Sequence, residues 1–185
     1  MSAAHGHGHG EHASGNKRVA LLISVLALVL AFSETLGKAA QTSAVAYNIE
    51  ALNLWNFFQA KTIRQTVLRT AAEELESGSA SETQRKQAAK WKETAQRYQS
   101  EPETGEGREQ LSARAKEAEK KREQAMAAYH HYELASAAVQ IGIVVASASI
   151  IAEIAALAWI GAVFGVIGMV FCVIGAFFPT AVHLF

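Results

Sequence analysis

The chain has 185 residues, of which 50% are apolar, and its 17 Lys and Arg residues balance 17 acidic residues, so the formal net charge is zero. A neutral chain has no overall field to attract nucleic acid, and we expect no nucleic-acid partner. The single cysteine, Cys172, excludes an intrachain disulfide framework and a cysteine-based zinc site. Only two prolines and almost no strand-like alternation of apolar and polar residues predict an all-α protein.

Residues 1–16 interleave histidine with glycine and lack apolar periodicity, so we expect a disordered tail. Its histidines are weak candidates for chelating Ni, Cu or Zn: His5, His7, His9 and His12. Glycine makes their ordering entropically costly, and Glu11 is the one carboxylate nearby. An incidental histidine tail is therefore the preferred interpretation, and we expect no cofactor.

We predict that residues 17–37 form the first transmembrane helix of an all-α membrane protein. The apolar run continues through Glu34 to reach the roughly 20 residues that a span needs. Glu34 then lies near the lipid headgroups. Gly37 and Ala39 have the small-residue spacing of a signal-peptidase site, so a cleaved signal peptide is the alternative to an uncleaved anchor.

Residues 38–133 predict a long antiparallel helical hairpin of coiled-coil-like character, with breaks near 77–81 and 101–107. Ser81 is suited to cap the helix that follows the first break. The first arm has a seam of residues spaced alternately four and three apart: Tyr47, Ala51, Leu54, Phe58, Lys61, Gln65, Leu68, Ala72 and Leu75. Because its seams are rich in Ala and aromatic residues, one hairpin buries little area, and we expect oligomerisation through the same faces.

Residues 134–154 and 158–178 predict the second and third transmembrane helices, followed by a short tail, 179–185. We place their turn between Glu153 and Trp159, because a charge avoids hydrocarbon and tryptophan settles at the membrane interface. The last span has a stripe of small residues suited to helix packing: Gly161, Gly165, Gly168 and Gly175. A pore lining is the alternative interpretation, but no polar stripe accompanies these glycines.

The stretch from Leu54 to Arg64 reads Leu-Trp-Asn-Phe-Phe-Gln-Ala-Lys-Thr-Ile-Arg and resembles the signature of a family of small bacterial membrane proteins, the domain of unknown function DUF4337. The family layout has an early anchor, a Trp-Asn-x-x-Gln-Ala helix, a charged helical middle and a C-terminal membrane hairpin. The resemblance covers residues 17–178 in layout and is specific over 55–72. It leads us to expect basic residues at the last turn, where this chain has Glu153. It implies an architecture and no activity.

Lys17 and Arg18 precede the first span and predict a cytoplasmic N-terminus. The basic residues before the second span favour the opposite orientation, but the segment between the spans is longer than the loops to which this rule applies. With the family resemblance, this implies a multi-pass protein of the bacterial inner membrane. Nucleotide-binding loops, metal-binding helix motifs and nucleophile elbows are missing from the sequence, so we expect no enzyme and no catalytic residue. We expect a scaffold or interaction module in the lipid bilayer, either a homo-oligomer or docked to a larger membrane complex. Its candidate contact residues are Trp55, Phe57, Phe58 and Lys61.

The alternative function is that of a small transporter, a channel or a metal-responsive membrane component. Glu34 and Glu153 are the carboxylates that such a function would use within the spans, together with the N-terminal histidines.

Overall fold

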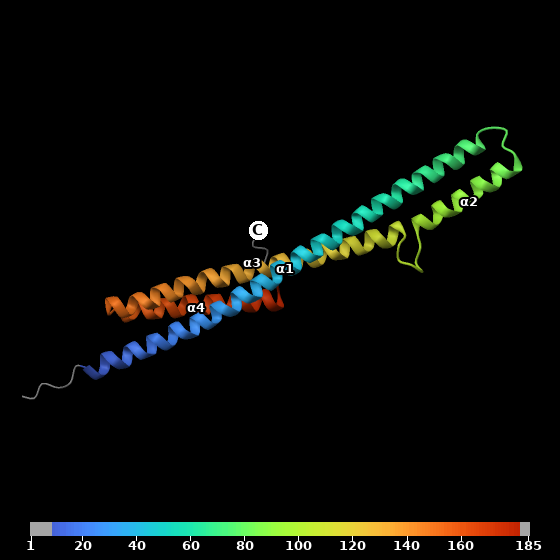
Figure 1. Ribbon diagram of the computed structural model, residues 1–185. Coiled ribbons are helices and arrows are strands. Elements are labelled where there is room, and N and C mark those ends of the chain that lie inside the picture. The colour runs from blue at the N-terminus through green and yellow to red at the C-terminus, as the bar shows by residue number, and fades with distance from the viewer. Residues whose placement is uncertain (1–8, 182–185) are drawn as a thin grey trace, which may run out of the picture. The chain divides into compact units, whose positions relative to one another are not determined.

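A computed structural model of the chain describes residues 9–181, with side chains from Asn16 onward. Within that range the chain forms four helices and no strand, which confirms the all-α prediction (Figure 1). The helices are α1 (His9–Glu76), α2 (Glu82–Gln99), α3 (Arg108–Ala152) and α4 (Ala155–Phe177).

Three of these helices are long and apolar enough to cross a membrane. They are α1 from Asn16 to Glu76, α3 and α4, and their most apolar stretches have mean hydropathies of 2.3, 2.1 and 2.5. Only small fractions of these stretches are buried within the protein, 11%, 33% and 17%, so most of their apolar surface faces outward. Outward-facing apolar side chains on a long helix are what hydrocarbon surroundings favour.

The described chain divides into two compact units, which α1 and α3 both enter. The first unit, called the apolar unit here, contains the residues up to Ser43 and those from Gln124 onward. The second, called the charged unit, is Ala44–Glu123.

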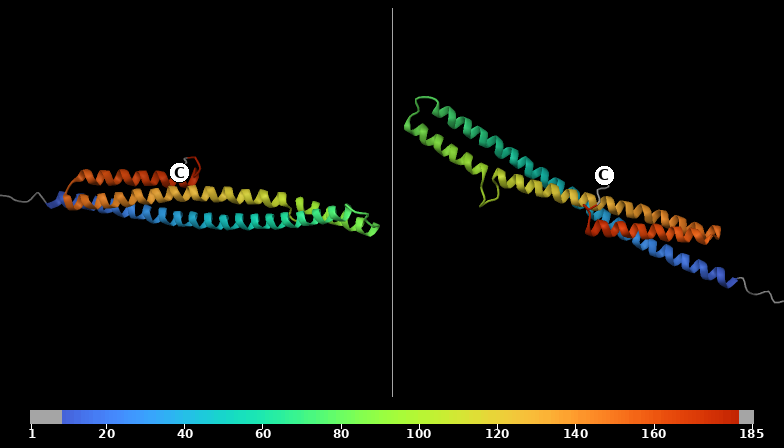
Figure 2. Two further views of the ribbon diagram at one scale, coloured as in Figure 1. Left: turned by 90° about the horizontal axis from the view of Figure 1, so that it is seen from above. Right: turned by 180° about the vertical axis from the view of Figure 1, so that it is seen from behind.

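The core of the charged unit comes from the predicted seam of α1. All nine seam positions, from Tyr47 to Leu75, are buried or half-buried. Ala51 and Leu54 form one cluster with three residues of α3, Leu111, Ala115 and Ala118. Figures 1 and 2 show α2 beside the last part of α1, where Ala88 and Ala95 of α2 are also buried.

Local chemistry explains where the helices of the charged unit end. Ser81 caps α2, because its hydroxyl accepts a hydrogen bond from the Gln84 amide and the Gln84 side chain accepts one from the Ser81 amide. Between α2 and α3, Gly105 adopts a left-handed φ of 69°, which glycine does without strain. Gly107 is buried where a side chain would collide with Gln110 and the Glu101 backbone.

The four predicted packing glycines of α4 are all buried in the apolar unit. A Cβ atom on Gly161 would lie 2.7 Å from the carbonyl oxygen of Gly142 in α3, and one on Gly175 would lie 3.0 Å from the His131 Cβ. A side chain at Gly165 would instead meet Leu26 of α1. The stripe therefore lets α4 approach two other helices closely.

Two boundaries differ from the sequence-based expectation. Helix α1 begins at His9, so the backbone of residues 9–16 is helical where the sequence predicted disorder. Extending an existing helix by a few turns costs far less free energy than nucleating a new one. The turn between the last two helices consists of Glu153 and Ile154 alone. Glu153 has a left-handed φ of 56°, which reverses the chain within two residues and leaves Trp159 inside α4.

Candidate functional site

Lys61 lies at the centre of a cluster of charged and aromatic side chains in the charged unit. Its side chain is only 7% exposed, and its ammonium nitrogen lies 3.8 Å from Glu101 and 3.6 Å from Glu106. The same nitrogen lies 5.4 Å from the centre of the Phe57 ring and 5.0 Å from that of Tyr98, within the range of cation–π attraction. The predicted contact residue Lys61 is therefore occupied within its own chain.

Trp55 and Phe58 also make contacts within the charged unit. The Trp55 indole Nε1 donates a 2.9 Å hydrogen bond to Glu119, and its ring meets the Phe58 ring edge-on at 5.4 Å between centres. The Arg108 guanidinium lies over the Phe58 ring at 4.9 Å. Of the four candidate contact residues, Phe57 keeps the largest exposed fraction, at 36%.

A polar network closes the cluster on the side of α2. Gln65 donates to the Ala95 carbonyl at 2.9 Å and accepts a hydrogen bond from Arg108, which also donates to Gln99 at 3.0 Å. The Nε atom of Arg108 is buried without a hydrogen-bond partner among the described residues. The two polar seam residues Lys61 and Gln65 thus tie α1 to the loop after α2 and to α2 itself. The four-three spacing identified both seam residues, but it gave no sign that Arg108 would be a hydrogen-bond partner of Gln65.

Arg97 and Glu101 form the ion pair at the start of this loop. The Arg97 guanidinium donates to the Glu101 carboxylate at 2.6 Å and holds the pKa of that carboxyl below its ordinary value of 4.5. Lys61 adds a weaker attraction to the same carboxylate.

A second apolar stripe runs along α1 on the face turned away from the core of the charged unit. It is called the outer stripe here and consists of Val45, Ile49, Leu52, Ile63 and Val67. Each of these side chains is between 53% and 65% exposed. Val45, Ile49, Leu52 and Ile63 follow the same four-three spacing as the seam, and Val67 lies one residue beyond the next position of that spacing. The sequence analysis missed this stripe because Asn56 and Gln59 interrupt it.

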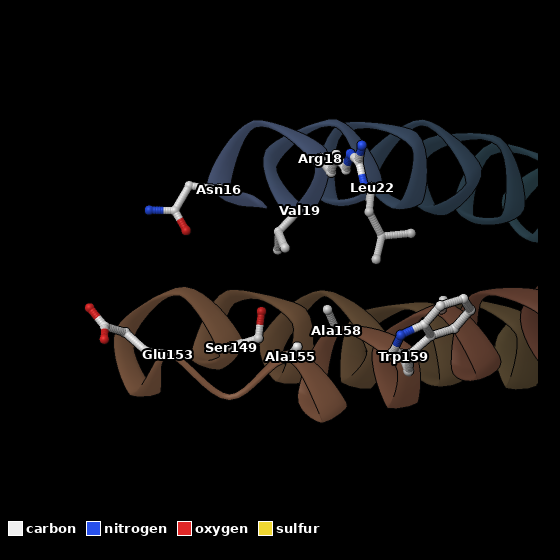
Figure 3. A pocket seen from close by; sticks show the side chains of 10 residues that line it. Asn16, Arg18, Val19, Leu22, Ser149, Glu153, Ala155, Ala158 and Trp159 are labelled. Carbon is white, nitrogen blue, oxygen red and sulfur yellow. The ribbon is translucent and has the colours of Figure 1, made fainter. Parts of the chain in front are cut away.

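In the apolar unit, a crevice of about 480 Å³ lies between the start of α1 and the turn that joins α3 to α4 (Figure 3). Val19, Leu22 and Ala158 contribute apolar lining, and Arg18 and Glu153 contribute charges. Figure 3 shows the Glu153 carboxylate at the outer end of the crevice. Charges beside an apolar interior suit the boundary between lipid headgroups and acyl chains.

Glu34, the other carboxylate singled out in the sequence, lies in a different polar group of the same unit. Its side chain accepts a 3.3 Å hydrogen bond from Gln140, and nearby the hydroxyls of Ser33 and Ser136 lie 2.8 Å apart. Glu34 helps to line a cavity of about 310 Å³ together with Tyr132. The structure thus places Glu34 and Glu153 in separate cavities.

Two of the metal candidates, His5 and His7, lie outside the described residues, and so do the side chains of His9 and His12. Among the side chains that the structure does describe, no group of three or more His, Cys or acidic residues could hold a metal ion. His131 is buried, with its Nε2 atom 3.2 Å from the Pro179 carbonyl and its ring stacked on Phe171. These contacts fasten the end of α4 to α3.

The chain matches the family described as Domain of unknown function (DUF4337) over residues 15–178. The match covers most of the chain, so the chain belongs to this family and the resemblance seen in the sequence is confirmed. No curated protein and no solved structure matches the chain.

Proposed function

We propose that this member of the DUF4337 family is a non-enzymatic, multi-pass membrane protein whose charged unit is a scaffold for protein–protein contacts. Its three apolar helices support membrane insertion, since side chains such as Leu21, Val144 and Phe177 are more than 60% exposed. In water such surface promotes aggregation, whereas a bilayer accommodates it.

The proposed scaffold is an antiparallel helical hairpin. Support comes from the order of its side-chain contacts, in which residues later in α1 meet residues earlier in the returning chain: Asn48 with Arg122, Trp55 with Glu119, and Glu76 with Lys92. In the apolar unit, Arg18 shares a crevice with Glu153, and Gly37 lies against Tyr132, so α1 and α3 have opposite directions there too.

The proposed orientation places the N-terminus and the turn at Glu153 on the cytoplasmic side of a bacterial inner membrane. Lys17 and Arg18 beside the first span support this assignment through the excess of positive charge on cytoplasmic flanks. The hairpin then lies outside the cytoplasm.

The observation that carries the scaffold proposal is the outer stripe. The inner seam of α1 is covered by α2 and α3, so self-association through that seam, our expectation from the sequence, would require the core to open. The outer stripe stays exposed on a helix whose other face is buried or half-buried. An exposed apolar row outside the spans is typical of an interaction surface.

Chemical crosslinking of the full chain in its native membrane, followed by purification in mild detergent, tests this function. We expect a discrete oligomer or a defined complex with another membrane protein. A strict monomer that captures no partner would overturn the scaffold proposal.

Transport is a second candidate, favoured by the polar group of Glu34, Gln140 and Ser136 on the apolar unit, where Glu34 and Gln140 are exposed. Such a function would use the carboxylates to bind or release protons or cations within the spans. Flux through liposomes that survives the double substitution Glu34→Gln and Glu153→Gln would contradict it.

A further inference from the structure

We propose that two copies of the chain associate in parallel through the outer stripe of α1, with Asn56 of each copy opposite Asn56 of the other. The inference rests on the proposed function, because a shared membrane holds both copies in the same direction.

The first step is the spacing of the exposed face. Val45, Ile49, Leu52, Asn56, Gln59 and Ile63 are separated alternately by four and three residues, and all six are exposed. This is the spacing of positions a and d in a two-stranded coiled coil. The core-facing seam occupies positions c and f of the same heptads, on the opposite side of the helix, so both faces can be covered at once.

The second step is the chemistry of the positions. Ile49 and Ile63 fall at a, and β-branched residues at a favour two parallel strands when d is Leu. Leu52 is the leucine at d, and the other d positions are Val45 and Gln59. Asn56 falls at a between the two isoleucines. Its amide both donates and accepts hydrogen bonds, so two Asn56 side chains satisfy each other only when the copies are parallel and in register. The a and d positions from Val45 to Ile63 have no charge, so two identical faces meet without repulsion.

The third step is the area of the face. From Val45 to Ile63 this face is roughly 27 Å long and about 10 Å wide, so it covers on the order of 270 Å² per copy. A stable interface between free proteins takes about 800 Å² per partner. The stripe alone is thus too small for a dimer in dilute solution, whereas two membrane-anchored copies meet at a raised effective concentration and already aligned. A second copy in the same bilayer is the occupant that this face fits.

Disulfide crosslinking of the full chain in native membranes tests the proposal, in a Cys172→Ser background. Single cysteines at the stripe, Ile49→Cys and Ile63→Cys, are compared with matched controls at the next exposed residues, Glu50→Cys and Arg64→Cys. Under mild oxidation we expect dimers to form at least about tenfold faster from the stripe cysteines, since equivalent a positions face each other in a parallel pair.

Equal crosslinking at stripe and control positions would overturn the proposal, as would crosslinks from Ile49→Cys to a different protein. If the stripe cysteines fail while chemical crosslinking still captures an oligomer or a partner, this inference fails and the scaffold function stands. A monomer in both experiments would overturn both.

Asn56 supplies an independent readout. We expect Asn56→Leu to change the distribution of oligomer sizes in native mass spectrometry of detergent-solubilised protein, because the polar a residue that sets strand number and register is lost. Glu50→Leu, at an exposed b position away from the a and d rows, should leave the dimer unchanged. An unaltered dimer in Asn56→Leu would overturn the assigned role of Asn56.

Discussion

The indole Nε1 of Trp55 donates a 2.9 Å hydrogen bond to the Glu119 carboxylate, joining α1 to α3 across 64 residues of sequence. The indole ring also packs against the core formed by Ala51, Leu54 and Leu111. Trp55 therefore has a structural role in closing the charged unit.

We expect Trp55→Phe to lower the stability of the charged unit by about 1–3 kcal/mol. The substitution keeps an aromatic ring in the core but removes the hydrogen bond to a charged acceptor. Thermal unfolding followed by circular dichroism in detergent measures the change. Trp91→Phe on α2, where the indole is half-buried, is the control for the loss of ring size and should cost less than Trp55→Phe. Equal losses in the two variants would mean that the bond to Glu119 contributes nothing measurable.

The ion pair between Arg97 and Glu101 predicts a pH-dependent contribution to stability. Because Arg97 holds the pKa of Glu101 below 4.5, folding favours the ionised carboxylate. The contribution is present above pH 4.5 and is lost as the pH falls through the lowered pKa of Glu101. We expect Glu101→Gln to lower the melting temperature at pH 7 and to match the wild type in strong acid.

Melting curves of the two proteins between pH 7 and pH 2 check this expectation. Glu103→Gln, in the same loop, is the matched control for the loss of one negative charge. A gap between wild type and Glu101→Gln that persists unchanged to pH 2 would argue that the effect is not electrostatic.

The glycine stripe of α4 predicts a steric effect. Gly161→Ala places a Cβ atom 2.7 Å from the Gly142 carbonyl and 2.9 Å from the Ala146 Cβ, so the helices must separate. We expect a loss of about 1–3 kcal/mol from overpacking. Ala176→Leu, at an exposed position of α4, should be tolerated. Melting temperatures in detergent compare the two variants. A Gly161→Ala protein as stable as the wild type would refute close packing between α4 and α3 at Gly161.

The turn between α3 and α4 predicts a stabilising substitution. Glu153 adopts a φ of 56°, where an L-residue costs about 1–2 kcal/mol more than in the right-handed region, and glycine avoids that cost. Glu153→Gly should therefore raise the stability slightly, by about 0.5–1 kcal/mol after the added freedom of the unfolded chain is included. Glu153→Val should lower it, because a β-branched residue resists this conformation most. Ile154 has an ordinary negative φ, so Ile154→Gly and Ile154→Val serve as controls. If glycine were also more stable than valine there, the effect at Glu153 would have a cause other than its left-handed backbone.

The seam of α1 shows what could be predicted from the sequence. A helix in water must cover one apolar face, so the four-three spacing identified the buried residues from Tyr47 to Leu75 without knowledge of their partners. The capping role of Ser81 was likewise readable, because it depends on residues three positions apart.

The contacts of Arg108 show what could not be predicted. Its neighbours Gln65 and Gln99 are brought together by the folded loop, and no local pattern specifies such a meeting. The two-residue turn at Glu153 was missed for a similar reason, since sequence rules assign left-handed backbone to glycine or asparagine rather than to glutamate. The outer stripe could not be recognised from spacing alone, because Asn56 and Gln59 interrupt its apolar residues.

The arrangement of the apolar unit makes the proposed orientation testable by cysteine accessibility. Arg18 and Glu153 share one crevice, whereas His131 meets Pro179 at the other end of α4. If the crevice lies on the cytoplasmic side, the proposed three-span topology puts residues 44–123 and the C-terminal end of α4 outside, because an odd number of crossings separates each from that side. In a Cys172→Ser background, a membrane-impermeant thiol reagent should then label Ser79→Cys and Ala181→Cys in intact cells. Asn16→Cys should be labelled only after the membrane is permeabilised, and the reverse pattern would invert the topology and move the outer stripe into the cytoplasm.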